Sequence, residues 1–137
     1  MNVAKVKSRR EIPPTYIPPF GCPYNYYTKL YFSLIGKGEV VLMPGDIYYF
    51  ERVKRVTIIH TVWGEYEIWD KLDDIYKKVS GMDFIRCHNS YIVYLPAIRE
   101  KQKNTFILRN GTRIGISRGF AKATRITFME WVEAQTL

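Results

Sequence analysis

The sequence has few cysteines and no long apolar run. Of its 137 residues only Cys22 and Cys87 are cysteines, too few for a disulfide scaffold, and no Cys-x-x-Cys spacing suggests a structural zinc site. Met1–Lys7 lacks the apolar stretch of a signal peptide, and no segment approaches the length of a membrane span. We therefore expect a reduced, cytoplasmic protein without membrane insertion.

Residue patterns for catalysis are also scarce. His60 and His88 are the only histidines, and His60 lies in an apolar segment, which favours a structural role. Cys87 and His88 are neighbours, but neighbouring residues of a strand point to opposite faces, so they do not activate each other. Pairing of Cys87 with His60 stays open, although no glycine elbow, phosphate-binding loop or dinucleotide fingerprint accompanies it. We expect no enzyme activity, no cofactor and no metal site.

The composition is basic and rich in aromatic residues. The formal net charge is +8, which favours a polyanionic partner because each phosphate contact by Lys or Arg releases counterions. An anionic membrane surface would satisfy the same charge, and so would simple solubility of a basic domain. Aromatic residues make up 15% of the chain, with 11 tyrosines, and this composition fits strands.

The chain divides into an N-terminal arm, residues 1–27, and a domain, residues 28–137. The arm begins with four cations and continues with five prolines, which favour extended chain without regular secondary structure. Its basic start fits contact with phosphates, but a solvated tail or a linker remnant is the favoured interpretation. Its aromatic residues suggest packing on the domain or on a protein partner.

From Thr28 onward, short apolar runs alternate with turn residues, which predicts strands. The predicted strand segments are Leu30–Ile35, Val40–Met43, Ile47–Phe50, Val56–Val62, Tyr66–Trp69, Phe84–Leu95, Ile98–Gln102, Thr105–Leu108 and Thr112–Ile116. Asn110-Gly111 between the last two is a strong hairpin signal. Glu51–Arg55 is expected to be a charged connection.

Two helices complete the prediction. Asp70 is expected to be the N-cap of a short helix, because apolar residues follow at helical spacing and Lys77 and Lys78 fall in its last turn. The segment Phe120–Glu133 is expected to form a closing amphipathic helix, because it places Phe120, Thr124, Phe128 and Trp131 at helical spacing. The fold class is therefore mostly β, with one short mid-chain helix and a C-terminal helix.

Cations and small polar groups gather in three places at strand ends and connections. The clusters are Arg52, Lys54 and Arg55; Arg86, His88 and Asn89; and Arg113, Arg118, Lys122 and Arg125. Arginine pairs bidentately with guanine and asparagine with adenine in the major groove, so these clusters fit the edges of DNA bases. For any single residue a scatter of surface charge is the preferred explanation, but three similar clusters in one β-rich domain favour a nucleic-acid surface.

The segment Phe84–Val93, with the sequence FIRCHNSYIV, resembles the signature of the LytTR-type DNA-binding domain of bacterial transcription regulators. Three further segments resemble the family in order: Asp46–Glu51 its opening strand, Leu72–Phe84 its helix and loop, and Leu108–Arg118 its closing hairpin. The resemblance covers about Leu30–Val132. It implies antiparallel β-sheets of LytTR type, in agreement with the strands predicted from the residues.

The resemblance also implies where DNA is contacted. Domains of this family are similar in inserting loops into successive major grooves, unlike readers that insert a recognition helix. By position, Asn89 and Arg118 match contact residues, and Lys54 and Arg55 fall in the first DNA loop. Arg86 and His88 are motif residues that either contact DNA or hold the loop by hydrogen bonds. Tyr94 departs from the family, which usually has asparagine there.

These features predict a bacterial transcription regulator that binds double-stranded DNA, with two copies on an imperfect direct repeat and a homodimer on DNA. Most relatives of this kind carry a receiver domain, for which the 27 residues of the arm are too short. The alternative is a protein-interaction role, in which the domain acts as a decoy or partner of a full-length regulator or a membrane inhibitor through its arm. RNA binding ranks third, because the aromatic residues fall into no stacking motif.

Overall fold

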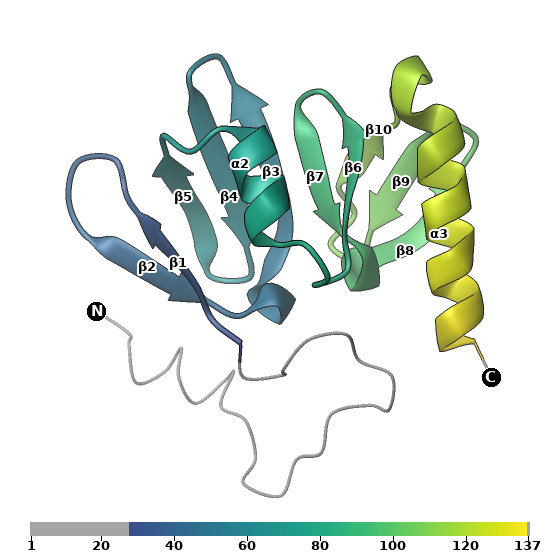
Figure 1. Cartoon of the computed structure of the whole chain (residues 1–137), viewed down its shortest axis with the longest axis horizontal. Helices are drawn as coiled ribbons and strands as arrows, with labels where there is room; N and C mark the ends of the chain where they lie inside the picture. The colour runs from purple at the N-terminus through teal and green to yellow at the C-terminus, as the bar shows by residue number, and fades with distance from the viewer. Residues whose placement is uncertain (1–27, 137) are drawn as a thin grey trace, which may run out of the picture.

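The computed structural model describes residues 28–136. The predicted arm, with Cys22, lies outside the described residues, as does Leu137. Within them the chain forms ten β-strands in three antiparallel sheets, together with the α-helices α2 (Leu72–Lys78) and α3 (Ala121–Gln135) (Figure 1). The predicted fold class, mostly β with a short mid-chain helix and a C-terminal helix, is confirmed.

A five-stranded sheet forms the middle of the molecule. Its strand order is β5-β4-β3-β7-β6, with bounds β3 Ile47–Val53, β4 Val56–Thr61, β5 Gly64–Ile68, β6 Phe84–His88 and β7 Tyr91–Tyr94. Successive side chains of a strand point to opposite faces, and both faces are covered here. Phe50, Ile59 and Ile92 enter one hydrophobic core, whereas Tyr49, Ile85 and Val93 enter the other.

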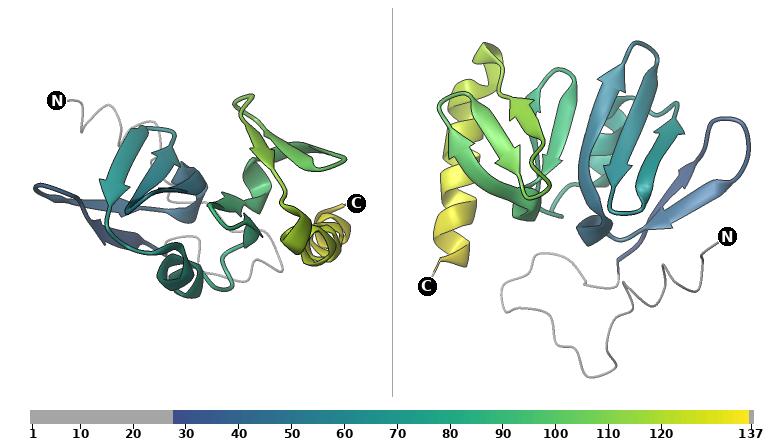
Figure 2. Two further views of the ribbon diagram at one scale, coloured as in Figure 1. Left: turned by 90° about the horizontal axis from the view of Figure 1, so that it is seen from above. Right: turned by 180° about the vertical axis from the view of Figure 1, so that it is seen from behind.

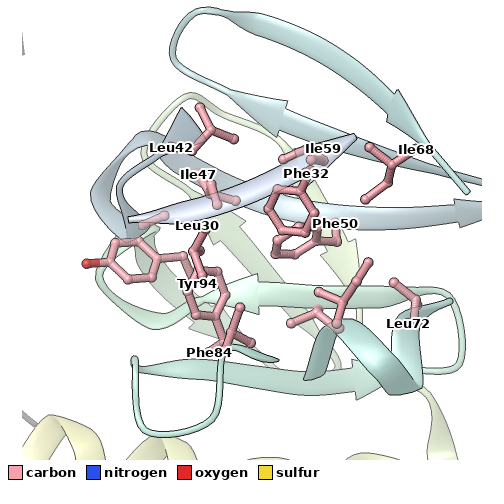
Figure 3. Close-up of a cluster of buried hydrophobic side chains, with 14 residues drawn as sticks. Leu30, Phe32, Leu42, Ile47, Phe50, Ile59, Ile68, Leu72, Phe84 and Tyr94 are labelled. Carbon is pink, nitrogen blue, oxygen red and sulfur yellow. The ribbon is translucent and has the colours of Figure 1, made fainter. Parts of the chain in front are cut away.

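The first core lies between this sheet, the hairpin of β1 (Leu30–Ser33) and β2 (Glu39–Leu42), and helix α2 (Leu72–Lys78), as Figure 3 shows. Phe32 from the hairpin meets Phe50 edge to face, with ring centroids 5.9 Å apart. Both rings are fully buried, and each such side chain contributes about 1.5–3 kcal/mol through burial. The hairpin therefore belongs to the folded unit.

The second core lies between the five-stranded sheet, a three-stranded sheet and helix α3 (Ala121–Gln135). The small sheet consists of β8 (Ile98–Gln102), β9 (Thr105–Leu108) and β10 (Arg113–Gly115). Phe106 packs against Phe128 of α3 with ring centroids 5.3 Å apart. Of the four residues predicted at helical spacing in the closing helix, Thr124, Phe128 and Trp131 lie on its inner face, whereas Phe120 is the N-cap residue and precedes the helix.

The predicted hairpin at Asn110-Gly111 is confirmed, since β9 and β10 pair in antiparallel register around it. Gly111 has φ +91°, a left-handed conformation that glycine adopts without steric cost. The Asn110 side-chain oxygen accepts a hydrogen bond from the Thr112 amide at 3.0 Å, which completes the turn.

The predictions for Asp70 and for Phe84–Leu95 are wrong. Asp70 does not cap α2: the N-cap position is Lys71, whose side chain makes no capping hydrogen bond. The Asp70 carbonyl instead accepts hydrogen bonds from Arg52 Nη1 at 2.9 Å and Thr57 Oγ1 at 2.6 Å, so its backbone is held against the sheet. Phe84–Leu95 is not one strand but the hairpin of β6 and β7, because the chain reverses at Asn89-Ser90.

Candidate nucleic-acid interface

Three connections lie side by side at one end of the molecule: the β3–β4 turn, the β6–β7 turn and the segment from β10 into α3. Figures 1 and 2 show them at the same end from the front and from behind. Two backbone hydrogen bonds join them, from the Arg52 amide to the Ser90 carbonyl at 2.8 Å and from the Ser117 amide to the Cys87 carbonyl at 3.0 Å. Residues far apart in the chain therefore share one edge, which we call the loop edge.

A register shift in β6 leaves the Cys87 carbonyl free to accept the hydrogen bond from Ser117. Arg86 pairs with Ile92 and His88 with Tyr91, so the register shifts at Cys87 as at a β-bulge. A bulged residue leaves the regular ladder, and its carbonyl is free to accept a bond from elsewhere. The Cys87 carbonyl takes the Ser117 amide, which anchors the start of the third connection to the second.

The β3–β4 turn presents Lys54 and Arg55. The strands pair up to Val53 and Val56, so the connection predicted over Glu51–Arg55 is only a two-residue turn. Both cations are exposed, and Lys54 has φ +58°, which is unusual for a residue with a side chain.

Arg52, the third cation of this cluster, has a structural position. Its guanidinium Nη1 donates to Thr57 Oγ1 at 2.9 Å and to the Asp70 carbonyl at 2.9 Å. These bonds join the end of β3 to β4 and to the chain entering α2. The side chain is therefore engaged in holding the base of the turn.

The β6–β7 turn is held by Arg86 and presents Asn89. The Arg86 guanidinium donates to the backbone carbonyls of His88 at 3.1 Å and Asn89 at 3.0 Å, and His88 Nδ1 accepts from the Ser90 amide at 3.0 Å. The hydrogen bonds that would make Arg86 and His88 structural are thus present. The exposed Asn89 side chain has no hydrogen bond to any described residue, so its amide is available to a ligand.

Asp73 at the start of α2 orients Arg86 from the other side. Its Oδ1 accepts from Arg86 Nη1 at 2.7 Å, and this hydrogen bond and the guanidinium charge lower the pKa of the Asp73 carboxyl. Arg86 is mostly buried, whereas Asp73 is exposed. The carboxylate stays ionised at neutral pH and keeps one end of the guanidinium in place.

The third connection presents Arg118. Ser117 is anchored to Cys87, and Arg118 opens the short 3-10 helix Arg118–Phe120 that leads directly into α3. The Arg118 side chain is exposed and has no hydrogen bond or ion pair within the described part of the chain. Lys122 and Arg125 continue the positive charge along the first turns of α3.

A fourth connection at the same end was missed from the sequence. The Asn104 carbonyl in the β8–β9 turn accepts a hydrogen bond from the Ile116 amide at 2.8 Å, which places this turn next to Ser117. Lys103 and Asn104 are exposed there. The signal was available: a lysine beside an asparagine in a turn between two predicted strands has the same composition as the other clusters.

The residues weighed for catalysis are occupied or inaccessible. His60 Nε2 lies 2.9 Å from Glu51 Oε1, its Nδ1 lies 3.2 Å from Glu65 Oε2, and its ring stacks on Tyr49 at 4.1 Å. The expectation of a structural histidine agrees with these contacts. The Cys87 thiol is fully buried, and burial raises its pKa to about 12, which leaves it unreactive as a nucleophile at neutral pH.

Within residues 28–136, no group of three or more histidine, cysteine, aspartate or glutamate side chains is arranged to hold a metal ion. No helix in this part of the chain is long and apolar enough to cross a membrane.

Comparison with known proteins gives a consistent result. The family model of the LytTr DNA-binding domain matches residues 37–128. The fold is similar to a solved structure, the LytTr DNA-binding domain of a response regulator from Bacillus cereus, with a TM-score of 0.63 and 21% sequence identity, covering 72% of this chain and 94% of that one.

Several curated proteins are similar in sequence. The chain is 32% identical over 93 residues to the sensory transduction protein LytT of Bacillus subtilis, covering 64% of this chain and 39% of that protein. It is 32% identical over 81 residues to the transcriptional regulatory protein YpdB of Escherichia coli K12, covering 56% and 33%. It is 35% identical over 72 residues to the transcriptional regulatory protein LytR of Staphylococcus aureus, covering 49% and 29%. The match thus spans about a third of each relative.

Proposed function

Because the chain belongs to the LytTr DNA-binding domain family, we propose that its loop edge binds double-stranded DNA and that the protein regulates transcription. One observation carries the proposal. Two hydrogen bonds, Arg52 to Ser90 and Ser117 to Cys87, bring exposed Lys54, Asn89 and Arg118 to the same end of the molecule from three separate parts of the chain.

The side chains on the loop edge suit two kinds of contact. Asn89 and Arg118 have free amide and guanidinium groups, which match adenine and guanine in the major groove. Lys54, Arg55 and Lys103 are exposed cations on flexible stems, which suit phosphates. We assign the first pair to base reading and the second group to positioning on the backbone.

Arg86 and His88 take a different part in the proposal. The sequence left two roles open for these residues, contact with DNA or holding the loop. Their hydrogen bonds within the β6–β7 turn support the second role. In this scheme they hold the turn in the shape that presents Asn89. The loops then enter successive major grooves along one face of the DNA, and two copies occupy an imperfect direct repeat inside a bacterial cell.

The test begins with selection of binding sites from random duplexes, followed by fluorescence anisotropy titrations. Asn89→Ala and Arg118→Ala should each lose about 1–3 kcal/mol of discrimination between the selected site and a scrambled duplex, roughly 5- to 150-fold. Lys54→Ala and Lys103→Ala should weaken binding to both duplexes and lower the salt slope by about one unit.

The matched control is Arg109→Ala. Arg109 is an exposed arginine at the β9–β10 turn, at the other end of the three-stranded sheet from Asn104, so its removal takes away the same charge outside the loop edge. The affinity of the Arg109→Ala variant for DNA should stay close to that of the native protein. Equal effects at Arg109 and at the loop edge, or no effect at either, would refute the mapping.

A further inference from the structure

The outer face of α3 carries a stripe of four residues that have no hydrogen-bond or ion-pair partner among residues 28–136. The helix packs on the second core through Thr124, Phe128 and Trp131, and it lies at the outside of the molecule (Figure 2). On the opposite side, Lys122, Ile126, Met129 and Glu133 are spaced at i, i+4, i+7 and i+11 and form one line along the helix.

The stripe is apolar in the middle and charged at both ends. Ile126 and Met129 are each 46% exposed, which is high for large apolar side chains. Lys122 and Glu133 are exposed and have no ion pair within residues 28–136. Arg125 next to the basic end and Glu130 next to the acidic end extend the same division of charge.

The charges oppose the dipole of their own helix. A helix is stabilised by acidic residues in its first turn and basic residues in its last, and α3 has neither. Lys122 lies in the first turn instead, and Glu133 lies in the last. Stability of the isolated helix therefore does not explain the arrangement.

We propose that this stripe binds the same stripe of a second copy, with the two helices antiparallel. In that pairing Lys122 faces Glu133 of the second copy, and Ile126 faces its Met129, because each pair of numbers is symmetric about the middle of the stripe. The two-fold relation repeats both contacts, so the stripe is self-complementary in charge and in apolar surface. The partner is thus a second molecule of this protein.

The antiparallel geometry has a consequence for DNA. Helix α3 begins at the loop edge, directly after Arg118, and runs away from it (Figure 1). In the antiparallel pair the second copy points its loop edge in the opposite direction. This dimer is therefore distinct from two copies side by side on a direct repeat, and it can hold two separate duplexes.

The contact is small. Fifteen residues make a helix of about 22 Å, so the buried area is at the low end of specific interfaces, and we expect weak, concentration-dependent association. Sedimentation equilibrium of the full chain without DNA should show monomers and dimers in equilibrium. Added salt should lower the dimer fraction, because it screens the ion pairs between Lys122 and Glu133 of the second copy.

Charge reversal tests the pairing. The variant Glu130→Lys/Glu133→Lys has an all-basic stripe, and Lys122→Glu/Arg125→Glu has an all-acidic one, so each alone should be monomeric. Mixed together they should form a heterodimer. The variant with all four changes has reversed but again complementary charges, and it should recover self-association, which separates pairing from any effect on folding.

The outcomes are distinct. Self-association that survives both double variants, or no heterodimer in the mixture, overturns the proposal and leaves the stripe to another partner. The Glu130→Lys/Glu133→Lys variant should still bind duplex DNA, because it retains every residue of the loop edge. Loss of dimerisation with DNA binding intact thus supports this inference independently of the proposed function.

Discussion

The Arg86 guanidinium donates a hydrogen bond to the backbone carbonyl of Asn89 at 3.0 Å, so a mostly buried cation fixes the turn from which an exposed amide projects. The same guanidinium is held from its other end by Asp73. Arg86 and Asn89 lie three residues apart in the chain, but the Arg86 side chain is mostly buried and the Asn89 side chain is exposed. This difference separates the residue that shapes the turn from the residue that the turn presents.

Replacing these two residues should have different effects. Arg86→Gln should lower the free energy of unfolding by about 1–3 kcal/mol, because it breaks bonds to two carbonyls and a carboxylate, and it should also weaken DNA binding. Asn89→Ala should weaken DNA binding while its stability stays within about 0.5 kcal/mol of the native value. Urea denaturation and anisotropy titrations of both variants measure this. A stable Arg86→Gln protein would show that its bonds do not hold the turn.

Lys54 offers a way to separate backbone strain from charge. Lys54→Gly and Lys54→Ala both remove the cation, but only glycine adopts φ +58° freely. We expect the glycine variant to be more stable than the alanine variant by about 1 kcal/mol. Both should lose DNA affinity equally. Differential scanning calorimetry compares the stabilities, and different DNA affinities of the two variants would indicate that the turn shape, not the charge, matters for binding.

Asp83 should make stability depend on pH. Burial raises the pKa of its carboxyl above the usual value of 3.8, so the folded protein disfavours the ionised form. The stabilising contribution is complete below the unfolded pKa and is lost as pH rises through the folded pKa. Asp83→Asn should therefore raise the melting temperature at pH 7 and leave it almost unchanged near pH 3. Asparagine also tolerates the φ of +64° at this position.

Thermal denaturation followed by circular dichroism from pH 3 to pH 8 measures this difference. The control is Asp74→Asn, which removes the same charge from the exposed surface of α2 and should bring no gain in stability. A pH-independent difference between Asp83→Asn and the native protein would contradict the assignment to ionisation.

Much of the fold followed from local patterns. The alternation of apolar and polar residues predicts the strands, and the Asn110-Gly111 pair predicts its hairpin, because both depend on neighbours in the chain. The closing helix follows from the spacing of Phe120, Thr124, Phe128 and Trp131, although Phe120 itself is the N-cap residue. The prediction for Asp70 was wrong because it used only local sequence. Its neighbours favour an N-cap, but its carbonyl accepts hydrogen bonds from Arg52 and Thr57, which are distant in the chain.

The candidate site divides in the same way. The sequence by itself determined which residue types stand at the connections, since Lys54, Asn89 and Arg118 could be selected from composition and from the family motif. Only the tertiary structure decided which of these side chains have intramolecular partners, and it added Lys103 and Asn104. Long-range hydrogen bonds, such as those of Ser117 to Cys87 and Ile116 to Asn104, join turns that the chain order separates. Such bonds form between backbone N–H and C=O groups, which all residues except proline carry, and the sequence therefore does not reveal which residues form them.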